Sequence, residues 1–589
     1  MCGIVGYVGE RPCRDILFGG LRKLEYRGYD SAGISIITDA GFQLVHSVGN
    51  LDNLEERLDL LDGGGSLGIA HTRWATHGRP STENAHPHTD CTERFAIVLN
   101  GIVENYLTLR AALEAEDHVF TSETDAEVVA HLIERAYDGS LQDAVAEAYR
   151  QMEGHFTFCA VAADEPDVIV GIRKETPLVA GVGKDENFLA SAVPAFLADT
   201  RTVVFPEDGD VVVVRRDGVL VFTLDGASVE RSPQIVDWDE EAAEKAGYET
   251  FMLKEIHEQP AALADTMAER IGSDGRVILE GLGLSPKAIR GLRRVIIVAC
   301  GTSSYAGLVG KYVLERWARL PVEVEVASEF RYRDPVLDGD CLCIAISQSG
   351  ETADTLAAMR LARKAGSHVL AVTNIVGSQA TREADGVLFT RAGLEIGVAA
   401  TKTFLAQVLA MQLLALYMAD LRGCLSGEAV REYTEEMRRI PALLSDYLEG
   451  DGIDKVEAAA RRYATSDYFM CLGRGVSLPV AMEGALKLKE ISYVPTEAYA
   501  AGEMKHGPIA LLDEGSPVLV VATDGPVYDK LMSNVQEVMA RGARVIAVAF
   551  EGNESLAEMT EEIFYVPRTD EMMSPLLSVV PLQLFAYHV

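Results

Sequence analysis

The first 240 residues alternate short apolar runs with charged turns. Runs such as GIVGYV (3–8), FAIVLNG (95–101) and HFTFCAVAA (155–163) have the composition of strands, and residues 123–137 and 140–152 have the spacing of helices. Strands interrupted by a few helices predict a layered α+β domain.

A polar segment follows this region. Residues 225–250 contain few apolar runs and predict a linker, after which FMLKEIHEQPAALADTMAERI has the pattern of a helix. Residues 226–284 are therefore expected to connect the first domain to the rest of the chain.

From about residue 290 the pattern becomes strand, small-residue loop, helix. RRVIIVA (293–299) leads through CGTSSYAG into a helix, CLCIAI (341–346) leads through SQSGETADT into another, and the pattern restarts at DYFMCLG (467–473). Such repeats predict two similar doubly wound α/β domains, each with a parallel sheet covered by helices. The predicted boundaries are 1–225 for the first domain, 285–425 and 453–589 for the α/β domains, and 426–452 for a helical connection.

Composition supports a multidomain globular chain with an unusual charge. The 589 residues correspond to three or four domains, and 48% apolar residues are ample for buried cores. The formal charge is −36, and only 14 of the 53 basic residues are lysine. This charge argues against nucleic acid as a partner, and we expect a cytosol rich in salt to screen the self-repulsion.

Neither a membrane span nor a secretory signal is predicted. The chain has no run of about 18 apolar residues, and its N-terminus lacks the apolar core of a signal peptide. Nine scattered cysteines form no CxxC pair, so no disulfide framework is expected. We therefore predict a cytoplasmic protein.

The N-terminus carries the first candidate site. If Met1 is removed, Cys2 offers both a thiol nucleophile and a free α-amine, whose pKa of about 8 suits a general base. By itself a cysteine at this position is more often accidental than catalytic.

Several nearby motifs contain residues that suit amide chemistry. YRGYDSAG supplies Arg27, which could clamp a carboxylate, and LNGIVEN places Asn100 and Gly101 just after a strand, where they could stabilise an oxyanion. SETDAE places Asp125 near a helix start, where it could pair with an ammonium group. Taken singly, Arg27 could equally form a surface ion pair and Asp125 a helix cap.

Jointly, these motifs and HTRWATHG (71–78) resemble those of class II glutamine amidotransferases. The resemblance covers residues 1–220 and implies an N-terminal-nucleophile hydrolase with an αββα sandwich. It implies that Cys2 is the nucleophile and that Asn100 and Gly101 form the oxyanion hole. The glutamine-binding residues it implies are Arg27, Trp74, Thr76, His77 and Asp125.

Two hydroxyl-rich loops form a second candidate site. CGTSS (300–304) and SQSGET (347–352) each lie where a strand passes into a helix, and a helix N-terminus binds anions. Because adjacent βα units place such loops at one sheet edge, a phosphate site is favoured over simple helix capping. No P-loop motif is present. The candidate residues are Ser303, Ser347, Gln348, Ser349 and Thr352.

The segment 483–511 concentrates three of the 14 lysines, Lys487, Lys489 and Lys505. On a helix, Lys487 and Glu490 would share a face, and the pair could be a surface ion pair or part of a site that moves protons.

These loops, with EIGVAATKTF (395–404), EGALKLKEISY and EAYAAGEMKHGP, resemble the two sugar-isomerase (SIS) domains of the glucosamine-6-phosphate synthase family. The family aminates and isomerises fructose 6-phosphate with ammonia passed internally from glutamine, and Trp74 matches the indole that gates the passage. The resemblance implies Glu490, His506 and Lys487 as catalytic residues and adds Thr302 and Val398 to the sugar-phosphate site.

The same resemblance implies a homodimer or larger homo-oligomer, in which His506 reaches a neighbour's site. No cofactor is implied. No metal is predicted either, because the sequence has no HExxH motif or Cys/His ligand spacing.

The chain ends at Val589, where relatives of this family continue into a short tail that carries a lysine. We expect a truncated synthase. The alternatives are a glutaminase that only binds sugar phosphate, and a sugar-phosphate-sensing regulator.

The acidic composition predicts a requirement for salt. Glutamine hydrolysis and the melting temperature should both rise from low to molar KCl, because counterions screen the repulsion among the 89 acidic residues. Titrating KCl while following both quantities tests this, and a flat or falling response would contradict it.

Overall fold

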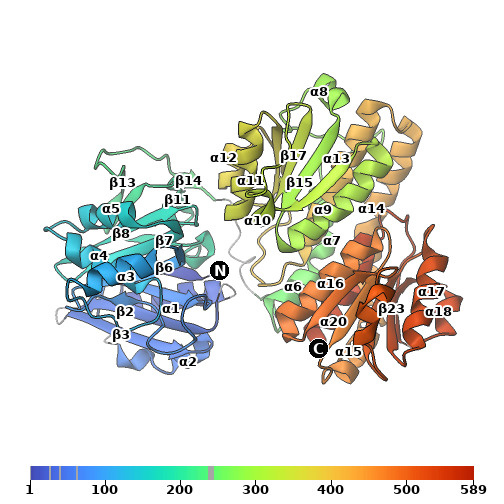
Figure 1. Cartoon of the computed structure of the whole chain (residues 1–589). Coiled ribbons are helices and arrows are strands. Elements are labelled where there is room, and N and C mark those ends of the chain that lie inside the picture. Colours follow the sequence, from blue (N-terminus) through green and yellow to red (C-terminus); the bar gives the residue numbers. More distant parts are fainter. Residues whose placement is uncertain (1, 26–27, 39–40, 62–63, 237–244, 561) are drawn as a thin grey trace. The chain divides into compact units, whose positions relative to one another are not determined.

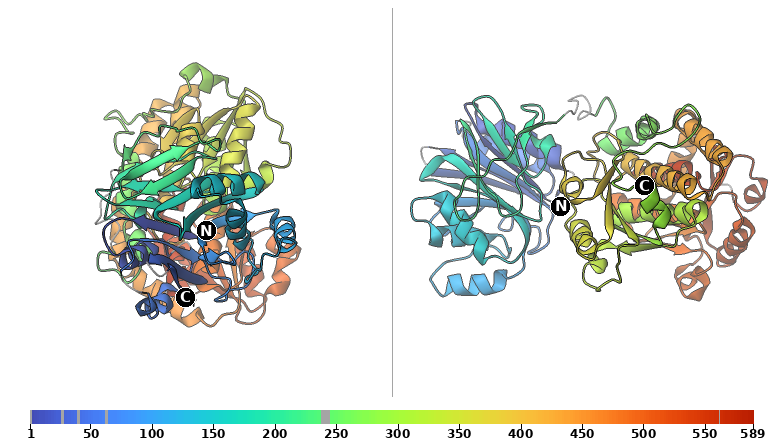
Figure 2. Two further views of the ribbon diagram at one scale, coloured as in Figure 1. Left: turned by 90° about the vertical axis from the view of Figure 1, so that its left-hand side faces the viewer. Right: turned by 90° about the horizontal axis from the view of Figure 1, so that it is seen from above.

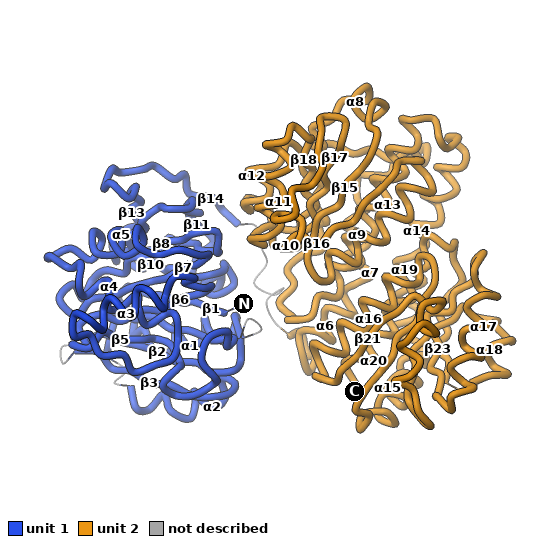
Figure 3. The backbone as a smooth tube through the Cα atoms, viewed as in Figure 1, with its two compact units in different colours: residues 1–244 blue, residues 245–589 orange. Residues whose placement is uncertain are grey.

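The computed structural model describes residues 2–25, 28–38, 41–61, 64–236, 245–560 and 562–589. It consists of two compact units, residues 1–244 and residues 245–589 (Figure 3).

Unit 1 is built on two antiparallel sheets (Figure 1). In spatial order, the eight-stranded sheet contains β14 (Gln234–Ile235), β11 (Thr202–Val204), β9 (Val179–Val182), β10 (Asn187–Ala190), β1 (Gly3–Val8), β4 (Leu67–Arg73), β2 (Ser31–Thr38) and β3 (Gly41–Val48). The six-stranded sheet contains β13 (Gly218–Phe222), β12 (Val211–Arg215), β8 (Glu165–Lys174), β7 (Gly154–Ala162), β6 (Phe95–Val103) and β5 (His88–Thr89).

Helices cover the outer faces of both sheets. The helices of this unit are α1 (Cys13–Leu24), α2 (Leu51–Glu55), α3 (Tyr106–Glu114), α4 (Glu127–Ala136) and α5 (Leu141–Gln151), with short 3-10 turns η2 (Leu58–Leu60) and η3 (Val193–Ala195). Strand β1 explains the layering: Val5 and Tyr7 pack toward α1, and Ile4 and Val8 pack against the other sheet. The predicted αββα sandwich is confirmed.

Unit 2 contains two five-stranded parallel sheets. The first has the order β16 (Val322–Val326), β15 (Arg294–Ala299), β17 (Cys341–Ile346), β18 (His368–Thr373), β19 (Gly386–Phe389). The second has the order β21 (Thr496–Ala500), β20 (Phe469–Gly473), β22 (Pro517–Ala522), β23 (Arg544–Phe550), β24 (Glu562–Val566). In each sheet the first strand in the chain lies beside both the second and the third, so the connections diverge there. Such a switch point is where doubly wound folds bind ligands.

Helices cover both faces of each parallel sheet, as Figures 1 and 2 show, and the predicted doubly wound fold is confirmed. The helices before α13 are α6 (Phe251–His257), α7 (Gln259–Met267), α8 (Pro286–Gly291), α9 (Gly301–Val313), α10 (Ala327–Phe330), α11 (Ala353–Lys364) and α12 (Gln379–Glu383), with a π-helical turn η5 (Leu314–Ala318). From there on they are α13 (Lys402–Arg422), α14 (Gly427–Glu449), α15 (Gly452–Tyr463), α16 (Ser477–Ser492), η6 (Met504–His506), η7 (Pro508–Leu511), α17 (Tyr528–Met539), α18 (Glu554–Ala557), α19 (Pro575–Ser578) and α20 (Val580–His588).

Helix α13 lies in the core that the two sheets of unit 2 share. It is long and apolar enough to cross a membrane, but 83% of its most apolar window is buried within the protein. Its apolar side chains belong to one cluster with residues from both sheets, including Ile344 and Ile546. A helix that is apolar all round is expected in such a position.

The segment after the linker differs from prediction. One helix was expected through residues 251–271, but α6 ends at His257 and α7 begins at Gln259. Pro260 stands in the first turn of α7, where its missing N–H costs nothing, and it cannot continue an earlier helix.

Candidate active sites

Cys2 lies at the head of β1, in the interior of the eight-stranded sheet. Because Gly3 pairs with Thr72 of β4, Cys2 lies beside Trp74, whose backbone N–H donates to Cys2 Sγ at 3.2 Å. Burial raises the pKa of the Cys2 thiol, against the opposing influence of the Trp74 backbone and the Arg73 charge. A thiol of this kind needs a base before it can act as a nucleophile.

Asn100 joins the two sheets at this point. Its amide nitrogen donates to the carbonyl oxygen of Cys2 at 2.9 Å, and its Oδ1 lies 3.0 Å from His71 Nε2. Burial lowers the pKa of His71 to about 3, so the imidazole is neutral, and its Nε2–H can donate a hydrogen bond to Oδ1. The Asn100 amide is thereby oriented with its nitrogen toward Cys2.

Gly101, like Asn100, lies inside β6 rather than just after a strand, so this detail of the prediction is wrong. The residue has a φ of +99°, and an added Cβ would lie 2.0 Å from the carbonyl oxygen of His155. Strand β6 therefore carries Asn100 and Gly101 in a conformation that only glycine permits at the second position.

Asp125 lies two residues before α4 and is almost fully buried. Its carboxylate accepts a hydrogen bond from Val103 N–H at 2.8 Å and lies 3.8 Å from His77 Nδ1. Burial raises the pKa of Asp125, although Val103, His77 and Arg73 oppose the shift.

Arg73 was not predicted as a site residue from the sequence. It is the last residue of β4, and its Nη2 donates to the carbonyl oxygens of His77 and Gly78. Its buried Nη1 has no hydrogen-bond partner in the part of the chain that is described. Burial lowers the pKa of Arg73, while the charges of Cys2 and Asp125 act in the opposite direction. The motif HTRWATHG contained the signal, an arginine at a strand end beside candidate residues.

The other predicted glutamine-binding residues take different positions. Trp74 is exposed and packs edge-to-face on Tyr29 with centroids 5.4 Å apart. Thr76 is exposed in the bend between Trp74 and His77. Arg27 lies outside the described residues.

The second site lies at the switch point of the first parallel sheet. Ala299 of β15 pairs with Ile346 of β17, so the loops that follow the two strands leave the sheet side by side. Ser347 Oγ lies 2.9 Å from Thr352 Oγ1 and accepts from Gly350 N–H at 3.1 Å. Ser349 and Gln348 lie in the same turn, and Thr352 precedes the first residue of α11. Their placement suits an anion at the N-terminus of α11.

A buried ion cluster joins α9, which covers the first parallel sheet, to α16, which covers the second. Lys487 has no exposed side-chain surface, and its Nζ lies 2.6 Å from Glu490 Oε2 and 3.3 Å from Glu483 Oε1. Thr302 Oγ1 accepts from Lys487 at 3.2 Å and donates to Glu483 at 3.2 Å. Lys487 and Glu490, which were predicted from one motif, therefore meet Thr302, which was predicted from another.

Glu483 was not predicted, although it stands one helical turn before Lys487. Burial raises the pKa of Glu483 to about 7, against the opposing Lys487 charge. Burial would lower the pKa of Lys487, but Glu483 and Glu490 raise it above its ordinary value.

The remaining candidates lie in separate places. Val398 is 49% exposed in the loop before α13, and Ser303 is half-buried on α9. His506 is exposed on η6, and within the described ranges its side chain makes no hydrogen bond or ion pair. The structure does not bring it into contact with Glu490.

Glu255 is a second carboxylate that was not predicted from the sequence, and it binds the backbone of the loop that contains Val398. Glu255 of α6 accepts hydrogen bonds from Ile396 N–H at 2.5 Å and Gly397 N–H at 3.0 Å. Burial, followed by the nearby Glu395 charge, raises the pKa of Glu255 to about 8.

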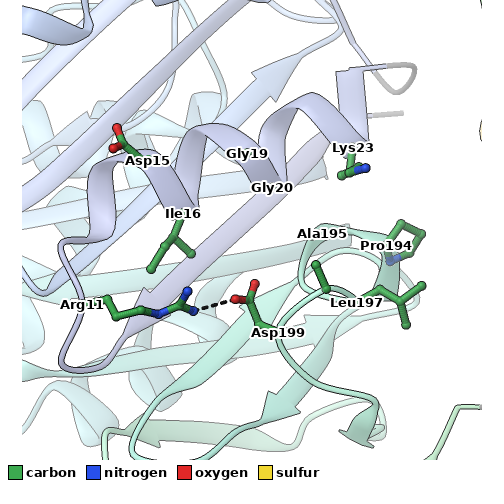
Figure 4. Close-up of a pocket in the computed structure, with 11 residues that line it drawn as sticks. Arg11, Asp15, Ile16, Gly19, Gly20, Lys23, Pro194, Ala195, Leu197 and Asp199 are labelled. Atoms are coloured by element: carbon green, nitrogen blue, oxygen red, sulfur yellow. Dashed lines mark hydrogen bonds and ion pairs between the residues drawn. The ribbon is translucent and has the colours of Figure 1, made fainter. Parts of the chain in front are cut away.

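A hollow of about 350 Å³ lies between α1 and the segment around η3 (Figure 4). Among its lining residues, Arg11 points to Asp199 and also binds Glu186, so its charge is already compensated. The lining contains none of the candidate site residues.

The geometry of β6 predicts that Gly101→Ala damages the first site. The methyl group would collide with His155, and the displaced strand would move Asn100, so we expect glutamine hydrolysis to fall roughly hundredfold. Gly139→Ala is the matched control, because Gly139 has a φ of +89° and open space around it. Equal rates for the two variants and the unchanged chain would contradict this assignment.

The buried carboxyl group of Glu483 predicts a pH-dependent stability. Its pKa rises from 4.5 when unfolded to about 7 when folded, so the folded state holds this proton more tightly. The stabilisation is full below pH 4.5 and is lost as the pH rises through about 7, a change of about 3 kcal/mol. Glu483→Gln removes this dependence. Melting temperatures of the two proteins, in concentrated KCl, should be similar at low pH, where both side chains are neutral, and the unchanged protein should melt increasingly below Glu483→Gln as the pH rises through about 7. An unchanged protein that instead melts above Glu483→Gln at high pH would show that the Lys487 pairing outweighs burial.

Comparison with known proteins covers the whole chain. The SIS domain family matches residues 288–417 and 466–589, and the glutamine amidotransferase domain family matches residues 71–198. A Clostridium tetani protein named glutamine–fructose-6-phosphate aminotransferase (isomerizing) is 50% identical over 589 residues, which are 100% of this chain and 96% of that protein. A protein of the same name from Thermus thermophilus is 51% identical with the same coverage.

One solved structure adds support for the second half. The C-terminal domain of glucosamine-fructose-6-phosphate aminotransferase from Francisella tularensis aligns with a TM-score of 0.56 at 38% identity. The alignment covers 59% of this chain and 97% of that domain.

Proposed function

Because this chain belongs to the family of isomerizing glutamine–fructose-6-phosphate aminotransferases, we propose that it makes D-glucosamine 6-phosphate and L-glutamate from D-fructose 6-phosphate and L-glutamine. The observation that carries the proposal is the 50% identity over all 589 residues, which spans both kinds of domain. This is the first step of amino-sugar synthesis.

Unit 1 releases ammonia in this proposal. Cys2 Sγ attacks the side-chain amide carbon of glutamine, and the resulting oxyanion is bound by the Asn100 amide and the Gly101 backbone N–H. Because burial disfavours the Cys2 thiolate, a neighbouring base must take the proton, and the α-amine of Cys2 supplies it once Met1 is removed. Collapse of the tetrahedral intermediate expels ammonia and leaves a thioester that water hydrolyses to glutamate.

The charged groups around Cys2 would hold the substrate. The Asp125 carboxylate suits the α-ammonium group of glutamine, with His77 beside it. The Nη1 of Arg73, which has no hydrogen-bond partner among the described residues, suits the α-carboxylate. This adds Arg73 to the proposed glutamine-binding residues Arg27, Trp74, Thr76, His77 and Asp125.

Unit 2 binds and isomerises the sugar. The hydroxyl-rich turn before α11 would bind the phosphate, with Ser347, Gln348, Ser349 and Thr352 as ligands and Thr302, Ser303 and Val398 around the sugar. Glu490 moves the proton between C1 and C2 of the open chain, and Lys487 holds its carboxylate 2.6 Å away.

Two further features of the proposal concern assembly and transfer. His506 is exposed, and within the described ranges its side chain makes no hydrogen bond or ion pair with Glu490. We therefore propose that it acts in the active site of a second copy, where it opens the sugar ring in a homodimer or larger homo-oligomer. We propose that ammonia passes internally to unit 2 and that Trp74, whose backbone N–H donates a hydrogen bond to Cys2 Sγ, gates the passage. We assign the protein to the cytoplasm, without a nucleic-acid partner or a cofactor.

One assay with three variants tests the two half-reactions. The unchanged chain should form glutamate and glucosamine 6-phosphate in equal amounts from glutamine and fructose 6-phosphate in concentrated KCl. Cys2→Ala should form neither, because the nucleophile is lost. Glu490→Gln should keep glutamate release but lose the amino sugar by about 10²–10⁴-fold.

Cys424→Ala is the control, because Cys424 is an exposed cysteine that belongs to neither site. Glutamate without amino sugar from the unchanged chain would contradict the proposed synthase and favour a glutaminase that only binds sugar phosphate. Unchanged glutamate release from Cys2→Ala would refute the role of Cys2.

A further inference from the structure

Four side chains that play no part in the proposed reaction converge on the outer face of unit 1. Cys91 lies in the turn after β5, His118 lies in the loop between α3 and α4, and His131 and Glu134 lie one turn apart on α4. They offer one thiol sulfur, two imidazole nitrogens and one carboxylate, whose ligand atoms all lie within 4.8 Å of one another.

The pairwise distances among these atoms are short. Cys91 Sγ lies 3.8 Å from His118 Nδ1 and 3.3 Å from Glu134 Oε2. His118 Nδ1 lies 3.3 Å from His131 Nδ1 and 2.9 Å from Glu134 Oε2. His131 Nδ1 lies 3.5 Å from the same carboxylate oxygen.

Four of these five distances, 3.3–3.8 Å, are close to those around a tetrahedral metal ion, and the 2.9 Å between His118 and Glu134 is shorter. Zinc bonds of 2.0–2.3 Å at tetrahedral angles separate the ligand atoms by about 3.3–3.7 Å. Four groups gathered around one position satisfy one another only in part by hydrogen bonds, since the two imidazoles face each other at 3.3 Å through the same kind of nitrogen, Nδ1, and only one of these nitrogens can donate to the other. A cation at that position would satisfy all four.

The surroundings orient the ligands in the manner of a built site. His131 is fully buried, and its Nε2 lies 3.8 Å from Glu127 Oε1, beyond hydrogen-bond distance, so the carboxylate acts on it through charge alone. A nearby negative charge favours the proton on Nε2, which leaves Nδ1 to bind a metal. Glu127 is itself fixed by the backbone N–H groups of Thr121 and Ser122, both at 2.7 Å.

The turn that carries Cys91 is held in a similar way. The Asp90 carboxylate accepts hydrogen bonds from the backbone N–H groups of Thr92 at 2.9 Å, Arg94 at 2.8 Å and Phe95 at 2.7 Å. The thiol therefore projects from a turn whose backbone has little freedom.

We propose that Cys91, His118, His131 and Glu134 bind one Zn²⁺ ion as a structural site. Mixed sulfur, nitrogen and oxygen ligands suit zinc, and four protein ligands leave no open position for catalysis. The ion ties the turn after β5 and the loop before α4 to α4 itself. That loop continues into Asp125, so the site would also steady a residue of the proposed glutamine pocket.

Metal content measured on the full chain tests the site. After incubation with Zn²⁺ and dialysis in concentrated KCl, the unchanged protein should retain about one zinc per chain by elemental analysis. Cys91→Ser should retain less than one tenth of that amount. Cys424→Ser, which changes an exposed cysteine outside the cluster, should match the unchanged protein.

Cobalt provides an independent readout. Co²⁺ bound by the unchanged protein should show a thiolate-to-metal charge-transfer band, which Cys91→Ser should lose. His118→Asn is a second variant in a loop, and it tests the site if Cys91→Ser does not fold. Zinc content that is absent from the unchanged protein, or equal in all variants as expected for nonspecific binding to acidic surface, would overturn the proposal.

Zinc removal should also change stability without reference to the enzyme reaction. A chelator should lower the melting temperature of the unchanged protein and leave that of Cys91→Ser unchanged. Because zinc content, the cobalt spectrum and the melting temperature do not depend on turnover, failure of the proposed synthase activity would leave these tests valid.

Discussion

The buried ammonium group of Lys487 is the constraint on which the architecture of unit 2 depends. A lysine without exposed surface is tolerated only when partners compensate its charge, and here Glu483, Glu490 and the Thr302 hydroxyl do so. These partners come from α9 and α16, which cover different sheets, so the two α/β domains cannot separate without exposing the cluster. The proposed isomerase site thus exists only because two repeats pack together around one charge.

Most of the fold could be predicted because strands leave a local signal. The interior parallel strands of unit 2 are short, continuous apolar runs, so RRVIIVA and CLCIAI located β15 and β17 closely, whereas edge strands such as β16 (VEVEV) carry charged residues. Boundaries were missed where backbone geometry decides them. Pro260 lies in the first turn of a new helix instead of within one long helix. Gly101 continues a strand with a positive φ, which the sequence pattern does not predict.

The candidate site was predictable only where a motif is contiguous. Lys487 and Glu490 share one helix turn, and Trp74 and His77 share one bend, so each pair was visible in the sequence. Arg73 and Glu483 belong to the same motifs but became candidates only through burial. The cluster around Glu134 could not be predicted from a sequence motif, because its ligands come from three segments that meet only where α4 packs on the six-stranded sheet.

This contrast explains why a chain without a metal motif can still hold a metal site. Spacing rules detect ligands that one turn or one helix brings together, and Cys91 and His118 are separated by a strand and a helix. What assembles them is the αββα sandwich, which fixes the turn after β5 beside α4. The same packing places Glu127 between His131 and the loop that leads to Asp125. A stabilising ion at one end of α4 and a substrate pocket at the other would therefore be consequences of a single packed helix.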